Sequence, residues 1–479
     1  MGYSEKVVVI GAGISGLSCV FRLRQLGLSP LVLEASSRSG GVIETVRRNG
    51  FLFELGPQCP RFPASVWALV HALGLESQFL PGDLKATRYI LKDGHLQLVP
   101  FSPGGLLSTR LLSAKSKFRL LSEVFRNSSP PPQEESLAEF VQRKFGPEVL
   151  DYLVDPLVST VFFGDARKMG MKSAFPTLVE WEGSSGSLIR GALRSCKAKR
   201  GISLSGNSAP SANSAFKSGS LRVTDSLPSL GSFRSGMAAL PERLAEELKD
   251  AIRYNQKIEF LTMSPGENGP WEIHLQNAEP ILAESLVLAI PAFTAAALLQ
   301  TSAPQIASLL NAIEYAPVCA VATAYNRSQV SHNLHGFGFM APRVEKRQTI
   351  CTFWNSSLFP GRGPAGKVVM TSFAGREGKD PVFSVSENEC AQIIEKENAE
   401  TLGIAGQPVD RVVWRSARAL PQYNIGHAQR ARQIAEALRA LPNLQIVGNF
   451  LSGRSVGDCV QIALQAAENL RDRLRGENI

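Results

Sequence analysis

The sequence lacks long hydrophobic runs. No stretch of its 479 residues reaches the roughly 18 consecutive apolar residues that a membrane-spanning helix requires. The amino terminus, MGYSEKVVVIGAG, enters a predicted strand almost at once and shows no cleavable signal pattern. These features favour a soluble globular protein and predict a cytoplasmic location.

The sequence has few cysteines, and no two of them are spaced as a metal-binding or redox pair. The seven cysteines are scattered, odd in number and without a CxxC motif, which argues against a disulfide framework or a thiolate metal site. His332 and His335 lie close together in the segment HNLH, but no carboxylate or thiolate partner is near. The sequence therefore predicts no metal site and fits a reducing compartment.

The signatures of nucleic-acid binding are also missing. A formal net charge of +9 suits an anionic partner, yet neither zinc-finger spacing nor an RNA-binding aromatic motif accompanies it, so we predict no nucleic-acid partner. What is present is ample core material. With 44% hydrophobic and 19% charged residues, the chain can form two or three domains.

The strongest local pattern lies at the amino terminus. The apolar run VVVI leads into GAGISG, a helical pattern follows, and the apolar run PLVLEA ends at Glu34, eighteen residues beyond Gly16. This order is typical of a βαβ dinucleotide-binding unit, whose glycines allow a tight turn and close approach to a pyrophosphate, and whose acidic residue binds a ribose. The predicted cofactor contacts here are Gly11, Ala12, Gly13, Ile14, Ser15, Gly16, Glu34 and Ala35.

A second segment, GRGPAG at residues 361–366, matches the same glycine pattern. It follows WNSSLFP instead of a buried strand, contains Pro364, and leads into the strand-like KVVMTSF. Because the motif requires a strand before it and a helix after it, we interpret this copy as a loop.

A glycine-rich extension follows the amino-terminal unit. SSRSGGVIETVRRNGFLFELGPQ places Gly40 and Gly41 after the second strand and Gly56 about fifteen residues later. Together these segments resemble the glutathione-reductase-like flavoproteins of the amine oxidase and phytoene desaturase superfamily. The resemblance implies FAD as cofactor, with further contacts at Gly41, Val42, Gly56, Pro57, Gln58, Ile258 and Trp414.

The carboxyl-terminal segment GNFLSGRSVGDC precedes an Ala-rich helix. In that superfamily the chain returns here to complete the flavin site, which implies contacts from Ser455 and Val456. A helix N-terminus would direct unpaired N–H groups at the flavin. The alternative is a small-residue turn that only packs the last helix.

Three motifs narrow the family. FRSGM followed by LP, PQYNIGH, and GNFLSGRSVGDC occur in this order, and the pattern extends over nearly the whole chain. Together they resemble the oxygen-dependent protoporphyrinogen oxidases of haem biosynthesis. That resemblance implies repeated hydride transfer from a porphyrinogen to FAD, six electrons in all, with oxygen reoxidising the flavin to give hydrogen peroxide.

Alternative functions stay open. The first is the similar coproporphyrinogen III oxidase, for which a tetracarboxylate substrate would call for more cations than Arg88. The others are an amine oxidase or desaturase, and an FAD-binding module without catalysis. The resemblance names a porphyrinogen and molecular oxygen as partners, and leaves a homodimer and contact with other haem-pathway enzymes undecided.

The landmarks divide the chain into α/β and α+β parts. We expect a Rossmann-like FAD-binding domain assembled from separated segments, a mixed-sheet substrate domain, and a mainly helical insertion that ends in a flexible Ser-rich loop near residues 201–220. The expected segments are 1–84, 232–300 and 410–479 for FAD, 85–231 for the insertion, and 301–409 for the substrate.

The insertion is basic near its start. Between Lys85 and Arg126 there are eight Lys or Arg against two Asp or Glu, interleaved with Leu and Phe. This pattern fits a helix pair lying on the cytoplasmic face of an anionic membrane. Leucines at helical spacing equally serve to pack a helix on its own domain, so both interpretations stand.

The resemblance also assigns substrate contacts. Arg88 matches the arginine that family members place near a substrate carboxylate, and Thr160 stands where the family usually has glycine. No catalytic triad, carboxylate pair or metal cluster is apparent, so we name no catalytic acid or base. The predicted substrate residues are Arg88, Thr160, Phe337, Met340 and Phe373.

Overall fold

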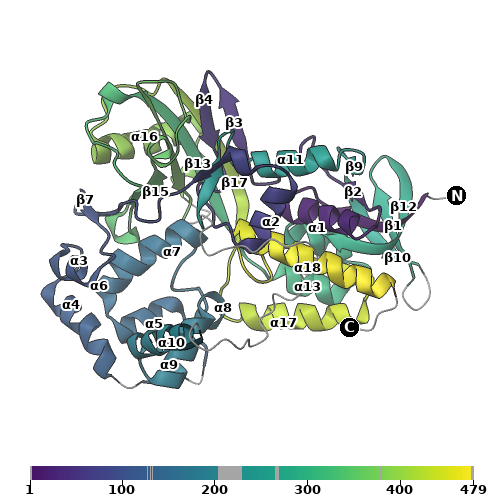
Figure 1. Ribbon diagram of the computed structural model, residues 1–479, viewed down its shortest axis with the longest axis horizontal. Coiled ribbons are helices and arrows are strands. Elements are labelled where there is room, and N and C mark those ends of the chain that lie inside the picture. The colour runs from purple at the N-terminus through teal and green to yellow at the C-terminus, as the bar shows by residue number, and fades with distance from the viewer. Residues whose placement is uncertain are drawn as a thin grey trace.

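The computed structural model describes residues 3–126, 128–129, 131, 133–202, 229–264, 269–376 and 380–475. Two large sheets and a group of helices make up the molecule (Figure 1). This is the expected α/β and α+β fold with mixed sheets. The predicted Ser-rich loop lies, apart from residues 201–202, outside the described residues.

The first sheet joins strands from distant parts of the chain. Its order is β10-β11-β12-β1-β2-β9, with β18 also paired to β12. β1 runs parallel to both β2 and β12, so the two ends of the chain and its middle meet in one sheet. The strands are β1 (Tyr3–Ile10), β2 (Leu31–Leu33), β9 (Ile252–Arg253), β10 (Ile258–Met263), β11 (Trp271–Leu275), β12 (Ala278–Leu288) and β18 (Leu444–Ile446).

Helices cover both faces of this sheet. Along β1, Val7 and Val9 belong to one buried cluster and Val8 and Ile10 to the other, as the twofold periodicity of a strand requires. On the first face lie α1 (Ile14–Gln25), α2 (Ala64–Ala72), α11 (Ala239–Glu247) and α18 (Val456–Leu474). On the second lie α12 (Ala292–Leu299), α13 (Pro304–Asn311) and α17 (His427–Ala437).

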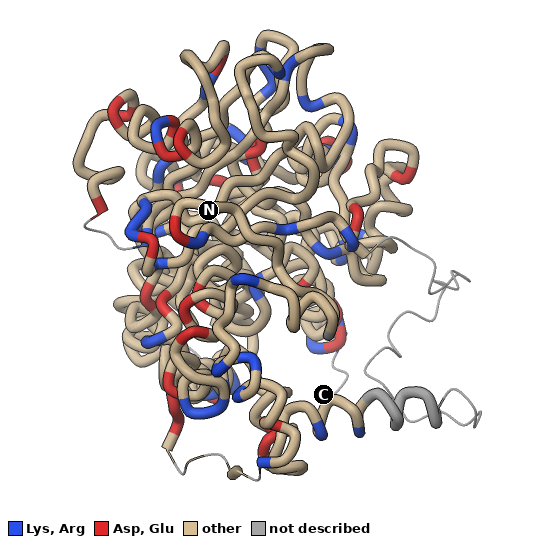
Figure 2. The backbone as a smooth tube through the Cα atoms, turned by 90° about the vertical axis from the view of Figure 1, so that its left-hand side faces the viewer, with Lys and Arg blue, Asp and Glu red and all other residues tan. Residues whose placement is uncertain are grey.

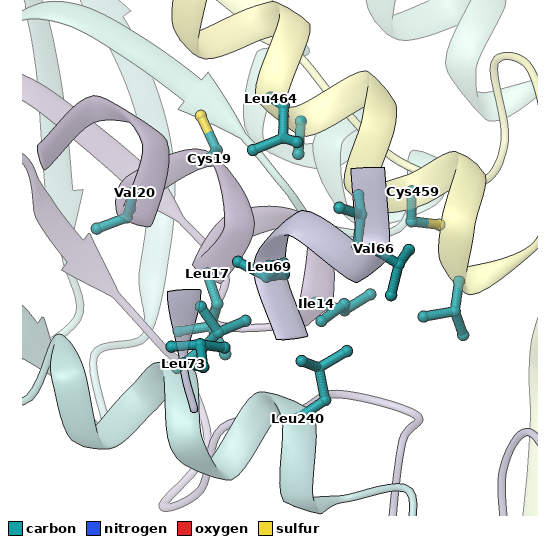
Figure 3. Packing of buried hydrophobic residues seen from close by; sticks show 14 of the residues in the cluster. Ile14, Leu17, Cys19, Val20, Val66, Leu69, Leu73, Leu240, Cys459 and Leu464 are labelled. Carbon is teal, nitrogen blue, oxygen red and sulfur yellow. The ribbon is translucent and has the colours of Figure 1, made fainter. Parts of the chain in front are cut away.

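The first face is the larger core. Figure 3 shows Leu17 and Val20 of α1 among Leu69 of α2, Leu240 of α11 and Leu464 of α18. Each fully buried side chain of this kind stabilises the fold by about 1.5 to 3 kcal/mol. The last helix is therefore held directly against the first.

The second sheet has the order β17-β13-β16-β15-β14-β6-β7 and is antiparallel except between β6 and β14. Helix α16 (Glu387–Leu402) packs on one face through Cys390, Ala391 and Ile394. The strands are β6 (Arg88–Lys92), β7 (His95–Leu98), β13 (Tyr315–Asn326), β14 (Gly338–Met340), β15 (Thr349–Phe353), β16 (Lys367–Ala374) and β17 (Asp410–Pro421).

Three strands depart from the expected grouping. β6 and β7 fall within 85–231, which we expected to be mainly helical, but they extend the second sheet. β17 falls within the segment expected to bind FAD, yet it pairs with β13 in the second sheet. Main-chain pairing to distant strands decides these positions, and such pairing leaves little local signal.

The helical group lies below the second sheet in Figure 1 and has its own buried core, which includes Leu111, Phe140, Leu150 and Phe162. Among the helices described, none combines the length and apolar character needed to traverse a bilayer. The group contains α3 (Pro103–Ser108), α4 (Ala114–Leu121), α5 (Leu137–Lys144), α6 (Pro147–Val149), α7 (Asp155–Phe162), α8 (Met171–Ala174), α9 (Pro176–Ser185) and α10 (Leu188–Ile202).

Short elements complete the described chain. The GRGPAG segment is a loop between α14 and β16, as its sequence context predicts. Figure 2 shows basic and acidic residues interspersed along the chain. The remaining elements are β3 (Thr45–Arg48), β4 (Phe51–Glu54), β5 (Phe79–Pro81), β8 (Gly231–Phe233), α14 (Asn355–Leu358) and α15 (Pro381–Ser384).

Candidate active site

The glycine loop between β1 and α1 leaves almost no room for side chains. Gly11 has a φ of +102°, and a Cβ there would lie 2.6 Å from the Ala289 carbonyl oxygen. A Cβ on Gly16 would lie 1.9 Å from the Gly11 oxygen. Gly13, which caps α1, differs because a Cβ there would meet no atom within 4 Å. That open space lies at a helix N-terminus, where unpaired N–H groups favour an anion.

Glu34 secures this loop from the end of β2. Its Oε2 accepts a hydrogen bond from the Ala12 N–H at 2.7 Å, and its Oε1 accepts one from the Ser36 N–H at 2.8 Å. Ile14 and Ser15 are buried in the first turn of α1. A half-buried carboxylate held in this way keeps lone pairs available for a ribose diol.

A cavity of about 360 Å³ opens beside Glu34. Leu33, Ala35, Ile290 and Leu298 contribute apolar walls, and Gln256, Ile258, Gln276 and Thr294 complete much of the lining. A flat base with an attached ribose fits a pocket of this size and polarity. The structure thus brings together the predicted residues Glu34, Ala35 and Ile258.

The second glycine loop closes on the first. Gly40 forms a parallel bridge with Gly13, and a Cβ built on Gly41, whose φ is +59°, would lie 3.4 Å from the Gly13 Cα. A Cβ on Gly56 would lie only 2.3 Å from the Val42 oxygen, so the backbone at Gly56 is in contact with the backbone of the second loop. The Val42 side chain is 53% exposed.

Pro57 and Gln58 follow Gly56, and hydrogen bonds to other residues hold the Gln58 side chain in place. Its Nε2 donates to the Glu54 and Gly56 carbonyl oxygens at 3.0 and 2.8 Å, and its Oε1 accepts from the Asn355 side chain at 2.6 Å. We therefore interpret Gln58 as a residue that orients this loop. Its own contact with the cofactor stays a prediction.

Helix α18 begins beside α1. The Ser455 Oγ accepts from the Asp458 N–H at 3.1 Å, and an Asp458 oxygen accepts from the Ser455 N–H at 2.9 Å, which is a capping box. Ser15, in the first turn of α1, lies beside the Cys459 thiol, which is one turn into α18. The N-terminal ends of α1 and α18 therefore lie together, with Val456 buried between them and the core.

A row of aromatic rings extends from Arg88. Its guanidinium lies 4.5 Å from the Phe337 ring centroid, and further ring contacts join Phe337 to Phe353, Phe353 to Phe373, and Phe373 to Phe163 at 5.8, 5.9 and 5.5 Å. We call these five residues the aromatic row. Three of them, Arg88, Phe337 and Phe373, are predicted substrate residues.

The other predicted residues flank the row. Met340 and the half-buried Trp414 pack in the same cluster as Phe373. The Thr160 side chain contacts the thiol of Cys351, which also belongs to that cluster. Trp414 lies on β17 opposite Ala320 of β13, so it borders the proposed substrate site. Its contact with the cofactor stays a prediction.

Sequence reasoning missed three residues here. Phe163 has a φ of +50°, an uncommon conformation for a bulky side chain, and Phe353 joins two predicted rings. The third is Arg454, whose guanidinium lies 3.0 Å from the Phe162 ring centroid and 5.3 Å from that of Tyr423. The doubled Phe of VFFGD and the Arg within SGRS were the available signals, but neither has meaning without its distant partners.

Burial shifts the protonation of several groups here. Desolvation lowers the pKa of Arg88, and it lowers that of Arg454 to about 10. Burial raises the pKa of Tyr423, and it raises that of the Cys59 thiol to about 12, although nearby Arg88 opposes the latter shift. At neutral pH both arginines are charged and the phenol and thiol are neutral.

These residues fit FAD. The glycine loops offer a space that a Cβ at Gly13 would narrow, Glu34 stands beside a cavity for the adenosine, and two helix N-termini converge between them. The aromatic row then provides flat apolar walls with the Arg88 cation at one end, and Arg454 stacks on Phe162, the residue before Phe163 in the chain. Such a site can bind a flat anionic molecule and exclude water from it.

Comparisons with known proteins show which family the chain resembles. The family model of the flavin containing amine oxidoreductases matches residues 14–471. The chain is 31% identical to the chloroplastic protoporphyrinogen oxidase of Oryza sativa, over 98% of this chain and 89% of that protein. It is 28% identical to the coproporphyrinogen III oxidase of Bacillus subtilis, over 95% of this chain and 96% of that protein.

Solved structures show the same fold. A crystal structure from Exiguobacterium superposes with a TM-score of 0.79 at 22% identity, covering 98% of this chain and 99% of that one. The cyclohexylamine oxidase of Brevibacterium oxydans superposes with a TM-score of 0.68 at 16% identity, with the same coverage.

Proposed function

The chain belongs to the flavin-containing amine oxidoreductase family and is an FAD-dependent oxidoreductase, and on that premise we propose that it oxidises protoporphyrinogen IX to protoporphyrin IX in haem biosynthesis. The aromatic row from Arg88 to Phe163 carries this proposal. A tetrapyrrole is a wide apolar molecule with carboxylates at its rim, and the row offers rings along its length and a guanidinium at its end.

The protein's own residues bind and orient. Arg88 pairs with a propionate and fixes one end of the substrate, while Phe337, Phe353 and Phe373 shield the reacting carbons from water. Bound FAD would supply the hydride acceptor. Three two-electron oxidations would each release one hydride and one proton from the porphyrinogen, and we propose molecular oxygen as the final acceptor, which takes the six electrons and six protons in total as three molecules of hydrogen peroxide.

Coproporphyrinogen III is the second candidate substrate. The Bacillus subtilis relative is named for this reaction, and Arg454 adds a second half-buried cation that a tetracarboxylate could use. Porphyrin fluorescence measured in air with each porphyrinogen separates the two. We expect the larger kcat/KM with protoporphyrinogen IX. A larger kcat/KM with coproporphyrinogen III would reverse the assignment, and turnover of amines alone would reject both.

We also propose that the helical group rests on an anionic membrane. Around α3 and α4 the side chains of Phe101, Leu107, Phe118, Leu121 and Phe125 are between 47% and 86% exposed. The basic residues Arg110 and Lys115 are exposed among them, whereas Leu111 and Leu112, which we had grouped with the exposed leucines, are buried. Apolar side chains with neighbouring cations are typical of interfacial binding.

Cosedimentation with phosphatidylserine vesicles tests this contact. We expect Phe118→Ser with Phe125→Ser to reduce binding at least tenfold, because two large apolar groups no longer enter the interface. Phe260→Ser is the matched control, since Phe260 is 40% exposed on the distant strand β10. Equal binding by the double variant and the wild type would reject the membrane surface.

A further inference from the structure

Arg454 is a cation that lies on aromatic rings. Among the residues that the structure describes, it forms no salt bridge or hydrogen bond, it stacks on the rings of Phe162 and Tyr423, and the negative charge of Asp458 acts on it only from a distance. The nearest carboxylate in sequence, Asp458, is engaged in the capping box with Ser455. Stacking on aromatic faces returns only part of the free energy that a guanidinium loses on leaving water.

The position of Arg454 is on the cofactor side of the molecule. It immediately precedes Ser455, the N-cap of α18, and that helix begins beside the start of α1 through the contact of Ser15 with Cys459. Its ring partner Phe162 adjoins Phe163 at the end of the aromatic row. Arg454 therefore connects the start of α18 with the chain segment that carries Phe163.

We propose that Arg454 raises the reduction potential of the bound flavin by placing a fixed positive charge beside the end of the cofactor that faces α18. Hydride transfer brings negative charge to a flavin, and a desolvated cation stabilises that charge more strongly than an exposed one. The dipole of α18 acts in the same direction. Arg88 stands at the opposite end of the aromatic row, so it is free to bind a substrate carboxylate while Arg454 acts on the cofactor.

The test is an equilibrium redox titration of the purified holoenzyme against a reference dye, without any porphyrinogen. We expect Arg454→Met to make flavin reduction about tenfold to a hundredfold less favourable, a fall of about 30 to 60 mV for this two-electron couple. Arg454→Lys retains the charge and should recover most of the potential. Affinity for sulfite, which adds to flavins as an anion, should fall in parallel.

Arg418→Met is the matched control. Arg418 also stacks on a ring, 5.0 Å from the Phe293 centroid, but it is exposed and outside the proposed site. We expect its midpoint potential to equal that of the wild type. Should Arg454→Met lose its flavin, Arg454→Gln provides a second neutral variant, and loss of FAD from both but not from Arg454→Lys supports the same role for the charge.

An unchanged midpoint potential in a flavin-loaded neutral variant would overturn the proposal. If the potential is unchanged while KM for coproporphyrinogen III rises, Arg454 is a substrate anchor instead. Because the titration contains no porphyrinogen, its result is independent of whether the proposed substrate is correct.

Discussion

At the scale of single residues, Gly13 is the position where a substitution should affect cofactor binding without affecting the stability of the fold. In the protein alone a methyl group at Gly13 meets nothing within 4 Å, whereas one at Gly16 would collide with the backbone. We expect Gly13→Ala to leave the thermal midpoint of the apoprotein unchanged and to weaken FAD binding by about tenfold to a hundredfold, because the methyl occupies the pyrophosphate approach. Fluorescence titration of apoprotein with FAD measures this.

Gly104→Ala is the matched control for that change. A Cβ at Gly104 likewise meets nothing within 4 Å, and this glycine lies in α3, far along the chain from the cradle. Its FAD affinity should match the wild type. Full FAD affinity in Gly13→Ala would show that the cofactor does not pass this loop.

Arg88 governs substrate affinity in this account. Its Nη1 donates to the Ala86 carbonyl oxygen at 3.1 Å, and its guanidinium is fixed on Phe337. A charge-assisted contact with a carboxylate contributes about 1.5 to 3 kcal/mol, so Arg88→Ala should raise KM by roughly tenfold to a hundredfold with normal FAD content. Arg88→Lys, which keeps the charge but not the stacking, should fall between the two. An unchanged KM removes Arg88 from the site.

The burial of His427 makes the stability of the protein depend on pH. It is buried and stacks on Tyr423 at 4.2 Å, and desolvation lowers its pKa to about 4. The unfolded chain binds this proton near pH 6.5, whereas the folded protein binds it only near pH 4. The stability of the fold is therefore highest above pH 6.5, where the imidazole is neutral in both states, and it decreases as the pH falls towards 4. Between pH 7.5 and 5 the loss is about 2 kcal/mol, or about 2 °C in thermal midpoint. His427→Phe keeps the stacking and should remove this share of the acid sensitivity, and an equal drop in both proteins would contradict it.

At the scale of elements, the loop that imitates a nucleotide motif has a structural role. Within GRGPAG the Arg362 side chain is buried, donates to the Ser232 hydroxyl at 2.8 Å and to the Phe233 carbonyl oxygen at 3.2 Å, and lies 3.9 Å from Glu54. Burial raises the pKa of Glu54, so removing the cation leaves an uncompensated acid. This loop fastens β16 of the second sheet to β8.

We expect Arg362→Met to destabilise the protein by about 3 to 5 kcal/mol, because a buried charge loses its partner. Differential scanning calorimetry should show the thermal midpoint falling by a few degrees. Arg24→Met is the control, since its pair with Asp250 is exposed and should contribute under about 1 kcal/mol. Equal midpoints in the two variants would mean that Arg362 does not hold the loop.

The elements also show what sequence could predict. The strand, glycine loop and helix at residues 3–25 were predictable because adjacent residues specify each of them: a continuous apolar run, the spaced glycines and the helical spacing of apolar residues. The loop character of GRGPAG followed from the same local logic. β6 and β17 were misplaced because a strand's sheet depends on partners far away in the chain, such as Gly338 for Arg88 and Ala324 for Asp410.

The residues of the candidate site also divide into those that the sequence could predict and those that it could not. The cradle residues around Gly13 and Glu34 were predictable from spacing, and Arg88, Phe337 and Phe373 from family motifs, although their cofactor and substrate contacts stay predictions. Phe163 and Arg454 were not predictable, because the αL backbone of one and the ring partners of the other arise only when α7, β17 and α18 meet.

At the scale of the whole molecule, the chain builds one sheet from its two ends and its middle. The first sheet pairs β1 with β12 and β12 with β18, and the helices α1 and α18 lie together on that sheet (Figures 1 and 3). Phe353 and Phe373 of the aromatic row lie on strands of the second sheet. The proposal requires a porphyrinogen bound along this row to face the cofactor.

Anaerobic mixing of the purified yellow holoenzyme with protoporphyrinogen IX tests this account most directly. We predict that the yellow colour of the flavin bleaches as porphyrin fluorescence appears, and that admitting air restores the colour. Flavin that stays oxidised in the presence of both protoporphyrinogen IX and coproporphyrinogen III would contradict the proposed function.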